Sequence, residues 1–546
     1  MFTLTLTPLF VALALVIPSR TLENGVGKTP AMGWNPYNVF SCGATEAQYR
    51  SNAQKLVDLG LKQAGLHVYL ADHERLRLAG IVVGKAQDAI HQAVLRGIQL
   101  FGIEVWGLFG CTFDSEPSGY FSCDDVNGSA RWIGSLNFED QDAETFASWG
   151  ADYLKYDNCY AVSETDFVDF DLPFELKPRF TKMRDSLAAT GRTILYSACE
   201  WGLQDPARWP GITVANSWRM SNDIGPPATW DNLFRIINQV VPITGFTGPG
   251  GFNDLDMLYV GNSGLTAAEQ QTHFSFWAAA KSPLFIGIDI TRPESEIADA
   301  LEILKNERVI AVNQDSLGKS ISFKRRYTND SDIWAGPLSD GSTVVLIINL
   351  QTSSRMVTLN LADVGFSSAN AQDLVTGNDL GRLTDIYATT LAGHGSMLLK
   401  LSSGSTVSPP DFTFYPASSG TLSGGANTRD VNGTTIVGFI GNGGKLTLDN
   451  LDGGSSGGTK LLAIDYINAE WTMSNTACSN CRQAMLRVNG GEEVRVQMPL
   501  SGQSWDIVFQ GYLVSVPGFR AGKTNTLEIY NPSAYTPDFV RVGIAV

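Results

Sequence analysis

The stretch FASWGADYLKYDNCY (residues 146–160) contains a short apolar run, residues 153–158, with an aspartate near its end. Seven similar runs lie at residues 31–35, 67–72, 99–106, 193–200, 213–223, 252–258 and 283–289. Several are separated by amphipathic segments, such as residues 46–59 and 174–187, with apolar positions at three- and four-residue spacing. Strand–helix–strand alternation at this pitch indicates parallel β pairing. Eight strands within about 270 residues therefore predict an α/β fold, a (β/α)8 TIM barrel over residues 25–305.

An open, doubly wound parallel sheet is the alternative arrangement for the same alternation. Sheets of that kind often bind dinucleotides through a glycine-rich turn at the start of a helix. No such fingerprint opens any of the helical segments. Its absence from the sequence favours the barrel.

After about residue 305 the pattern becomes all-β. Strand-like runs at residues 343–349, 355–361 and 396–401, with turn residues between them, predict an antiparallel β-sandwich over residues 310–401. Residues 402–410, SSGSTVSPP, have the composition of a linker. Residues 411–546 are rich in Gly, Ser, Thr and Asn with short strands, which predicts a further all-β, jelly-roll-like domain.

Composition limits the function classes. The chain of 546 residues, 43% hydrophobic and 17% charged, is expected to form several globular domains rather than a disordered chain. Its net charge of -16 counts against nucleic-acid binding, which needs a basic surface. No stretch reaches the roughly 18 apolar residues of a membrane span. We therefore expect a soluble protein suited to acidic surroundings.

Residues 1–20 have the pattern of a secretory signal peptide, because the apolar run LFVALALVI (residues 9–17) is too short to span a bilayer. A buried first strand is the alternative. Sequons at Asn127, Asn329 and Asn432 are compatible with glycosylation on the secretory route. The sequence thus predicts a secreted, extracellular protein.

The chain has seven cysteines, an odd number. Cys478 and Cys481 form a CxxC, but no second such pair or His pair accompanies it. A small local disulfide is therefore expected there rather than a zinc site. No other metal-ligand cluster occurs in the sequence, so no metal or cofactor is predicted.

Three predicted strands end in acidic residues: residues 155–158 (KYDN), 219–223 (RMSND) and 254–257 (DLDM). Reactive side chains of such barrels lie at the carboxyl ends of the strands. Lys155 and Asp157 are two apart on one strand, so they share a face, and the cation is expected to keep the carboxylate ionised. A strand-end carboxylate that caps the next helix is the alternative for each acid. Three together, among aromatics, favour a sugar site.

Five motifs in this order resemble glycoside hydrolase family 27, the α-galactosidases and their relatives. They are TPAMGWNPYN (residues 29–38), FASWGADYLKYDNCY (146–160), SACEWG (197–202), WRMSNDI (218–224) and GPGGFNDLDML (248–258). The resemblance covers about residues 25–400. It implies the barrel, a C-terminal antiparallel β domain, a substrate with terminal α-galactosyl groups and a retaining mechanism without a cofactor.

The resemblance also assigns residues. It implies that Asp157 is the nucleophile and Asp223 the acid/base, with their carboxyls about 5 to 5.5 Å apart. Positions that line the galactose pocket in the family correspond to Trp34, Asp72, Lys155, Cys199, Glu200, Trp201, Arg219 and Asp256. For Cys199 a buried free thiol is the alternative. Cys123 and Cys159 match a family disulfide.

The resemblance breaks in one segment. At the end of the second strand the sequence reads YLADHER (residues 69–75), in which only Asp72 matches the family's acid, Cys and Trp. Residues 73–117 do not resemble the family, and the match resumes near residue 119. Either the second and third loops were rebuilt, or a reading-frame or splicing error kept the length and lost the pattern; we favour the second. Cys42 is then unpaired or joined to Cys111.

Two other functions remain open. A relative acting on α-N-acetylgalactosamine or β-L-arabinopyranose is one, although Glu200 beside the sugar's 2-position favours a plain hydroxyl there. A carbohydrate-binding protein without turnover is the other, although both Asp157 and Asp223 are retained.

Residues 415–426, 438–448 and 513–546 resemble carbohydrate-binding module family 35, which implies that the last domain binds sugar. A domain that only stabilises the catalytic part is the alternative.

Overall fold

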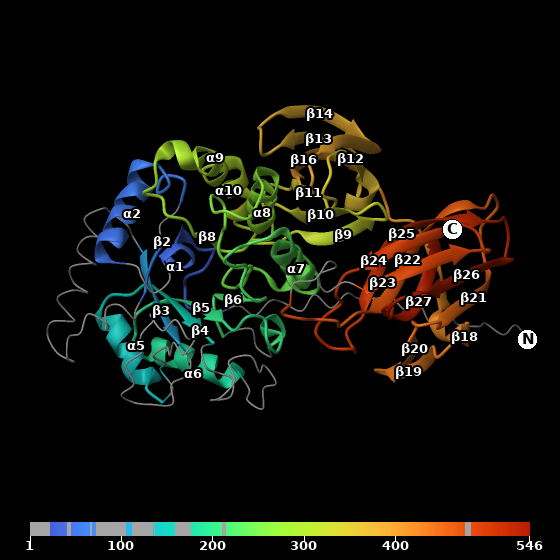
Figure 1. Ribbon diagram of the computed structural model, residues 1–546, viewed down its shortest axis with the longest axis horizontal. Helices are drawn as coiled ribbons and strands as arrows, with labels where there is room; N and C mark the ends of the chain where they lie inside the picture. Colours follow the sequence, from blue (N-terminus) through green and yellow to red (C-terminus); the bar gives the residue numbers. More distant parts are fainter. Residues whose placement is uncertain are drawn as a thin grey trace, which may run out of the picture.

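The computed structural model describes residues 22–40, 45–65, 68–72, 105–111, 135, 137–158, 176–209, 214–474 and 482–545. These residues form three parts: an α/β barrel, a middle β domain and a C-terminal β module (Figure 1). The barrel and the C-terminal module lie at opposite ends of the long axis (Figure 1).

Parallel strands form the wall of the barrel. In chain order they are β1 Met32–Trp34, β2 Val68–Asp72, β3 Val105–Cys111, β4 Tyr153–Asp157, β5 Leu195–Cys199, β6 Ser217–Arg219, β7 Phe252–Asp254 and β8 Leu284–Ile286. They are hydrogen-bonded in the order β7-β6-β5-β4-β3-β2-β1-β8. The ring closes just past β7, where Leu258 pairs in parallel with Ile286 of β8. The predicted (β/α)8 topology is therefore confirmed.

Helices surround this sheet (Figure 1). They are α1 Tyr37–Phe40, α2 Glu46–Asp58, α5 Glu139–Ser148, α6 Leu176–Ala189, α7 Trp230–Val240, α8 Ala267–Ala279, α9 Glu294–Leu304 and α10 Glu307–Asn313, with 3-10 turns η2 Pro206–Arg208 and η3 Val241–Phe246. Thr45, Thr229 and Thr266 begin α2, α7 and α8 with capping boxes, which satisfy backbone amides that have no partner within the helix. Among the described helices, none is long and apolar enough to cross a membrane.

The third strand differs from its prediction. Residues 99–106 were expected to form it, but β3 begins at Val105 and ends at Cys111. Its place is fixed by its neighbours, since Val105 pairs with Val68 of β2 and Cys111 pairs with Asp157 of β4. An apolar run in the sequence does not reveal which of its residues will pair with the two neighbouring strands.

The middle domain is a two-layer antiparallel structure. Its strands are β9 Ser322–Tyr327, β10 Ser331–Pro337, β11 Thr343–Asn349, β12 Arg355–Asn360, β13 Phe366–Asp373, β14 Asp379–Thr384, β15 Ile386–Leu391 and β16 Ser396–Thr406, with the 3-10 turn η4 Leu361–Val364 before β13. The order β14-β13-β16-β11-β10-β9 forms one sheet, and β12 pairs with β15 in the other. Residues 344–348 of β11 are all apolar because alternate residues face two cores: Leu346 packs with the barrel core and Ile347 packs with the core of the domain.

The predicted linker, residues 402–410, is wrong in its first half. Residues 402–406 continue β16, and Thr406 pairs with Phe366 of β13. The composition SSGST is that of a flexible segment, but the ladder to β13 offers its backbone hydrogen bonds, and these decide its conformation.

The C-terminal module is a β-sandwich. Its strands are β17 Phe412–Pro416, β18 Thr421–Ser423, β19 Asn427–Val431, β20 Thr434–Gly438, β21 Lys445–Leu451, β22 Gly458–Ile467, β23 Arg482–Val488, β24 Glu493–Met498, β25 Phe509–Phe519, β26 Asn525–Tyr530 and β27 Asp538–Ala545, with the 3-10 turn η5 Ala417–Ser419 after β17. One sheet has the order β19-β20-β27-β22-β25, with β17 on β27, and the other has β18-β21-β26-β23-β24.

The module is packed against the middle domain. The ring of Phe323 on β9 lies 6.2 Å from that of Phe509 and 6.4 Å from that of Tyr512, both on β25. Arg495 of β24 forms an ion pair with Asp330, at 2.7 Å. Aromatic packing and an ion pair between the two parts fix the orientation of the module.

A buried histidine predicts how stability depends on pH. His273 on α8 is fully buried, and its Nε2 accepts the backbone N–H of Tyr259 at 2.9 Å, so the ring is neutral. Burial lowers the pKa of His273 from its ordinary 6.5 to about 3. Between these values the unfolded chain binds a proton that the folded protein does not. This contribution to stability is therefore complete above pH 6.5 and is lost as the pH falls towards 3.

We expect His273→Gln, which keeps a hydrogen-bond acceptor but cannot take up this proton, to flatten that dependence. From pH 7 to pH 4 the wild-type free energy of unfolding should fall by about 3 kcal/mol more than that of the variant. Urea unfolding of both proteins at the two pH values measures the difference. Equal losses would contradict a neutral His273.

Candidate active site

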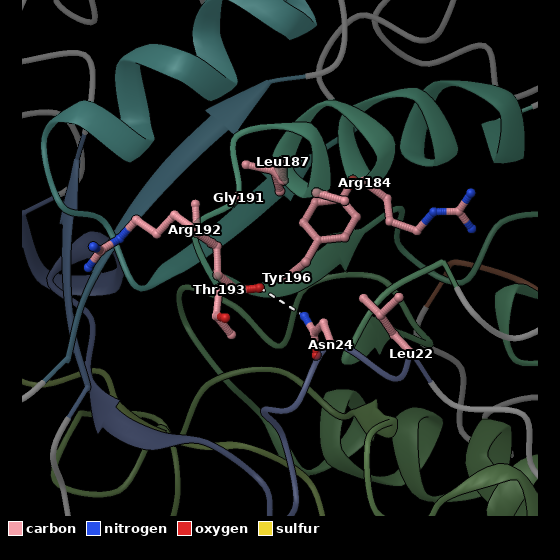
Figure 2. Close-up of a pocket in the computed structure, with 10 residues that line it drawn as sticks. Leu22, Asn24, Arg184, Leu187, Gly191, Arg192, Thr193 and Tyr196 are labelled. Atoms are coloured by element: carbon pink, nitrogen blue, oxygen red, sulfur yellow. Dashed lines mark hydrogen bonds between the residues drawn. The ribbon is translucent and has the colours of Figure 1, made fainter.

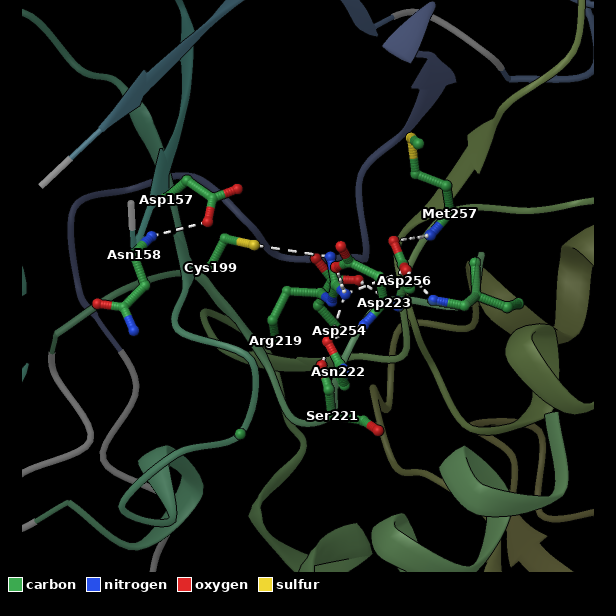
Figure 3. A network of polar contacts seen from close by, with 12 residues as sticks. Asp157, Asn158, Cys199, Arg219, Ser221, Asn222, Asp223, Asp254, Asp256 and Met257 are labelled. Carbon is green, nitrogen blue, oxygen red and sulfur yellow. Dashed lines mark hydrogen bonds and ion pairs between the residues drawn. The ribbon is translucent and has the colours of Figure 1, made fainter. Parts of the chain in front are cut away.

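The strand-end acids meet around one cavity at the carboxyl ends of the barrel strands. Its lining residues are Tyr37, Asn38, Lys155, Asp157, Trp201, Arg219, Asp223, Gly225, Asp256 and Met257. They come from the ends of β4 to β7 and from α1, so segments up to 220 residues apart in sequence contribute to it. Figure 3 shows Asp223 and Asp256 gathered around Arg219, while the carboxylate of Asp157 contacts Asn158. The prediction that Asp157 and Asp223 face a common cavity agrees with this lining.

A second cavity lies at the other end of the barrel, before β5 (Figure 2). Asn24, Thr193 and Tyr196 line it together with Arg184 and Arg192, and no carboxylate is among its described lining residues. Reactive groups of (β/α)8 barrels lie at the carboxyl ends of the strands. The cavity of Figure 3 is therefore the candidate active site.

Asp157 is the last residue of β4 and is 8% exposed. Its Oδ1 accepts the backbone N–H of Asn158 at 2.7 Å. Burial raises the pKa of Asp157; Lys155, on the same face of β4, opposes this, and the Asp223 carboxylate adds to it. The expectation that Lys155 favours the ionised carboxylate is correct in direction, but burial outweighs it in the unliganded protein.

Asp223 lies on the loop after β6, and its side chain is 58% exposed. Its Oδ1 is 2.6 Å from Nη2 of Arg219, a guanidinium that is only 2% exposed. Partial removal from water by itself raises the pKa of Asp223, but Arg219 and Lys155 outweigh this effect and lower it. In the unliganded site a proton is therefore held more readily by Asp157 than by Asp223.

Asp256 ties the ends of β6 and β7 together. Its Oδ2 lies 3.0 Å from Arg219 Nη2 and accepts the N–H of Ile224 at 2.7 Å, while its Oδ1 accepts the N–H of Met257 at 2.7 Å. The residue has φ = 83°, a left-handed conformation that costs energy outside glycine. These contacts hold Asp256 in this strained conformation and fix the residue that follows Asp223.

Three predicted pocket residues follow one another at the end of β5. Trp201 lines the cavity. Glu200 is fully buried, is not among the lining residues, and its Oε2 accepts the N–H of Gly202 at 2.8 Å. Cys199 is a buried free thiol whose Sγ lies 3.6 Å from Nη1 of Arg219. Trp201 therefore lines the cavity, and its contact with galactose stays a prediction, whereas Glu200 and Cys199 lie behind the lining.

The prediction for Trp34 is wrong. Its side chain is fully buried, its indole donates to the backbone oxygen of Ile288 at 2.8 Å, and its ring packs against Tyr49 of α2. Tyr37, just past β1, lines the cavity instead. Side chains alternate along a strand, so Trp34 faces the helix layer, and an aromatic residue beyond the end of the strand can reach the mouth of the barrel.

The sequence interpretation also missed Asn38, Gly225 and Met257 in the lining. Asn38 and Met257 belong to motifs of the family resemblance, and that was the only signal that could have found them.

Several predicted residues cannot be placed. Asp72 ends β2 opposite Phe109 of β3, but its side chain lies outside the described residues. So do Asn127, Cys42, Cys123, Cys159, Cys478 and Cys481 and nearly all of residues 73–118. Asn329 and Asn432 are exposed in turns of the two β domains.

Comparison with known proteins gives the family. A family model described as α-galactosidase A matches residues 119–315, and one for the α-galactosidase C-terminal β-sandwich domain matches residues 328–401. The probable α-galactosidase D of Aspergillus fumigatus is 35% identical over 657 aligned positions, which cover 99% of each chain. The chain belongs to the α-galactosidase family, glycoside hydrolase family 27. The first family match begins where the sequence resemblance resumes after residue 117.

Solved structures of α-galactosidases share the barrel and the middle domain. α-Galactosidase I of Mortierella vinacea is 30% identical with a TM-score of 0.59, covering 70% of this chain and 100% of that one. An α-galactosidase of Saccharomyces cerevisiae with raffinose is 27% identical with a TM-score of 0.57, covering 70% and 99%. In both comparisons the match covers nearly the whole solved chain but only 70% of this one. The fold and the family predicted from the sequence are thus confirmed.

Proposed function

We propose that this α-galactosidase-family chain hydrolyses terminal α-D-galactosyl groups of galacto-oligosaccharides or galactomannans with retention of configuration. The observation that carries this proposal is the shared cavity, which two carboxyls, Asp157 and Asp223, line together with two cations, Lys155 and Arg219. Relatives that match nearly the whole chain are named α-galactosidases, and a related structure was solved with raffinose, an α-galactoside.

In the proposed mechanism an Asp157 oxygen attacks the anomeric carbon while the bond from that carbon to the leaving oxygen breaks. The leaving oxygen takes the proton of Asp223, and a covalent galactosyl ester forms on Asp157. A water molecule then gives a proton to Asp223 and its oxygen to the anomeric carbon, which frees Asp157. The two inversions leave the α-anomer, and each group returns to its starting state.

This sequence needs the proton on Asp223 when the substrate is bound, whereas Arg219 favours its ionised form in the unliganded site. The two carboxyls interact, since the ionised Asp223 raises the pKa of Asp157. A galactoside whose oxygen lies beside Asp223 must loosen the contact with Arg219. Arg219 keeps a partner in Asp256, so this loosening does not leave a buried cation unpaired.

The stereochemistry of the first product tests the proposal. With a nitrophenyl α-galactoside followed by proton NMR, α-galactose should appear before mutarotation produces the β-anomer. An initial β-anomer would contradict a covalent intermediate on Asp157. The same chromogenic group on α-N-acetylgalactosamine and β-L-arabinopyranose tests the rival substrates. We expect the galactoside to have the highest kcat/KM.

We also infer that the C-terminal module binds carbohydrate. Phe439 and Tyr535 are 56% and 47% exposed, and they lie on adjacent loops joined by the N–H of Thr536, which donates to the oxygen of Ile440 at 2.8 Å. Phe439 also has φ = 57°, a costly conformation for an aromatic residue. Exposed rings of this kind stack on sugar faces.

Affinity electrophoresis through galactomannan tests this module. Phe439→Ala and Tyr535→Ala should each remove most of the retardation seen with the wild type. Phe414→Ala is the matched control, since Phe414 is also exposed, at 38%, but packs under Arg541 on β27. Retardation that survives both substitutions would leave the module as a packing domain.

We further propose that residues 1–20 are removed on export, that Asn127, Asn329 and Asn432 are glycosylated, and that Cys123–Cys159 and Cys478–Cys481 are disulfides. The exposed positions of Asn329 and Asn432 support the glycosylation sites. Intact mass before and after deglycosylation and reduction of the secreted protein tests all three.

A further inference from the structure

The C-terminal module contacts the barrel beside the proposed active site. The segment after β22, residues 468–474, reaches the barrel, and the side chains of Trp471 and Met473 pack against the barrel core. The module therefore touches the catalytic domain directly, in addition to its packing on the middle domain.

This segment holds the loop that carries Asp223. Gln239 of α7 donates from Nε2 to the backbone oxygen of Thr472 at 2.8 Å, and its Oε1 accepts the hydroxyl of Ser221 at 2.5 Å. Asn222 donates from Nδ2 to the backbone oxygen of Met473 at 3.5 Å, and its Oδ1 accepts the N–H of Asp223 at 2.8 Å. Two side chains thus link the segment to the two residues before Asp223.

A second contact reaches the neighbouring loop. Gln503 of the module donates from Nε2 to the oxygen of Gly202 at 2.7 Å. Gly202 follows Trp201 of the cavity lining, and its N–H contacts Glu200 Oε2 and the backbone oxygen of Arg219. The module therefore contacts both the loop that carries Asp223 and the neighbouring loop after β5, which contains Trp201 and Gly202.

Residues 468–474 are held in place by hydrogen bonds within the module. Asn468 is fully buried, and its Nδ2 donates to the oxygen of Met498 at 3.0 Å while its N–H donates to Ser501 Oγ at 2.9 Å. Arg482 of β23 donates from Nε to Glu470 at 2.9 Å. A segment with such anchors can transmit the position of the module to the barrel.

We propose that residues 468–474 and Gln503 are positioning elements for catalysis: the C-terminal module holds the loop of residues 220–224, and so the carboxyl of Asp223, at the place where it protonates the leaving group. This inference rests on the proposed role of Asp223. The carboxyl is half-exposed on a loop that follows a three-residue strand. Arg235 of the barrel holds the backbone of this loop through the oxygens of Asn222 and Asp223, and the module adds the contacts at Gln239 and Asn222. A displacement of about 1 Å at a catalytic group can cost about 10²-fold in rate.

The test uses the full-length double variant Trp471→Ala/Gln503→Ala. An acid matters most for a poor leaving group, so kcat/KM on an α-galactosyl disaccharide, which reports the first step alone, should fall about 10-fold or more, while kcat/KM on a nitrophenyl α-galactoside should change less than about 2-fold. Hydrolysis of the ester on Asp157 also uses Asp223, so on the nitrophenyl substrate any fall in kcat should be matched by a fall in KM. Trp471→Phe, which keeps an aromatic ring and leaves Gln503 unchanged, should retain the wild-type rate on the disaccharide. Phe414→Ala, on the same module, should leave both rates unchanged.

Each other outcome overturns the inference. Equal losses on both substrates together with a lower unfolding temperature would mean that the module only stabilises the barrel. Unchanged rates on both substrates would mean that the contacts do not position Asp223. Asp223→Ala separates this inference from the function on which it rests: if that variant shows no preference for the better leaving group, the role of Asp223 is wrong whatever the module does.

Discussion

Asp157→Asn is expected to lower kcat for a nitrophenyl α-galactoside by about 10⁴-fold or more. The other two carboxylates of the described lining are engaged elsewhere, Asp223 by Arg219 and Asp256 by Arg219 and the N–H of Ile224, so neither can replace the attacking group. The amide has almost the same shape, and burial already raises the pKa of Asp157, so the neutral side chain suits its surroundings. Initial rates at saturating substrate, with far-UV circular dichroism to verify the fold, measure the effect.

Asp289→Asn is the matched control. Asp289 is also an acid just past a strand end, but its Oδ1 accepts the N–H of Thr291 at 2.9 Å and it is not among the cavity-lining residues. We expect less than a 2-fold change in kcat there, as for an acid that only caps a turn.

Azide makes the test of Asp157 specific. In Asp157→Gly a small anion can enter from the side of the missing carboxylate, so added azide should restore turnover and give the β-galactosyl azide. Rescue that gave the α-azide, or Asp157→Asn with wild-type activity, would rule out Asp157 as the nucleophile.

Asp223→Ala is expected to have the second largest effect, and one that depends on the leaving group. Loss of a general acid costs typically 10²- to 10⁴-fold, so kcat/KM on an α-galactosyl disaccharide should fall by about 10³-fold, and much less on the nitrophenyl galactoside. The fold should survive because Arg219 keeps its contact with Asp256, at 3.0 Å. Steady-state kinetics on the two substrates measure the ratio.

The pH profile gives a second measurement on the same variant. The alkaline limb of kcat/KM reports the group that must be protonated, so it should disappear in Asp223→Ala. Azide should give the α-galactosyl azide, because it attacks the ester on Asp157 from the open side. A leaving-group ratio equal to that of the wild type would contradict the acid role.

Much of the catalytic part could be read from local sequence. Apolar runs and amphipathic segments alternate, and this alternation predicts the parallel strands and helices of the barrel because each run needs burial on both faces. The same order places Asp157, Asp223 and Asp256 at strand ends, and parallel strands bring those ends to one side. These predictions depend only on short-range pattern and on the closure of the barrel.

The fine placement could not be read in this way. Trp34 and Tyr37 are three residues apart in one motif, and whether either reaches the cavity depends on the direction of β1 and the position of α2. Residues 402–406 have a linker composition but form a strand because β13 offers them backbone partners. Glu200 lies behind the lining, where its carboxylate accepts a hydrogen bond from the N–H of Gly202.

The sequence by itself determined the barrel, the family and the acids at its mouth, since these follow from periodicity and from motifs of adjacent residues. Only the tertiary structure decided the protonation preference of the two carboxyls and the attachment of the C-terminal module to the loop of Asp223. Both depend on groups distant in the chain: Lys155 of β4 lowers the pKa of Asp223, and Gln239 of the barrel donates to the oxygen of Thr472 at 2.8 Å. Charge interactions and packing act through space, so a linear pattern does not reveal them.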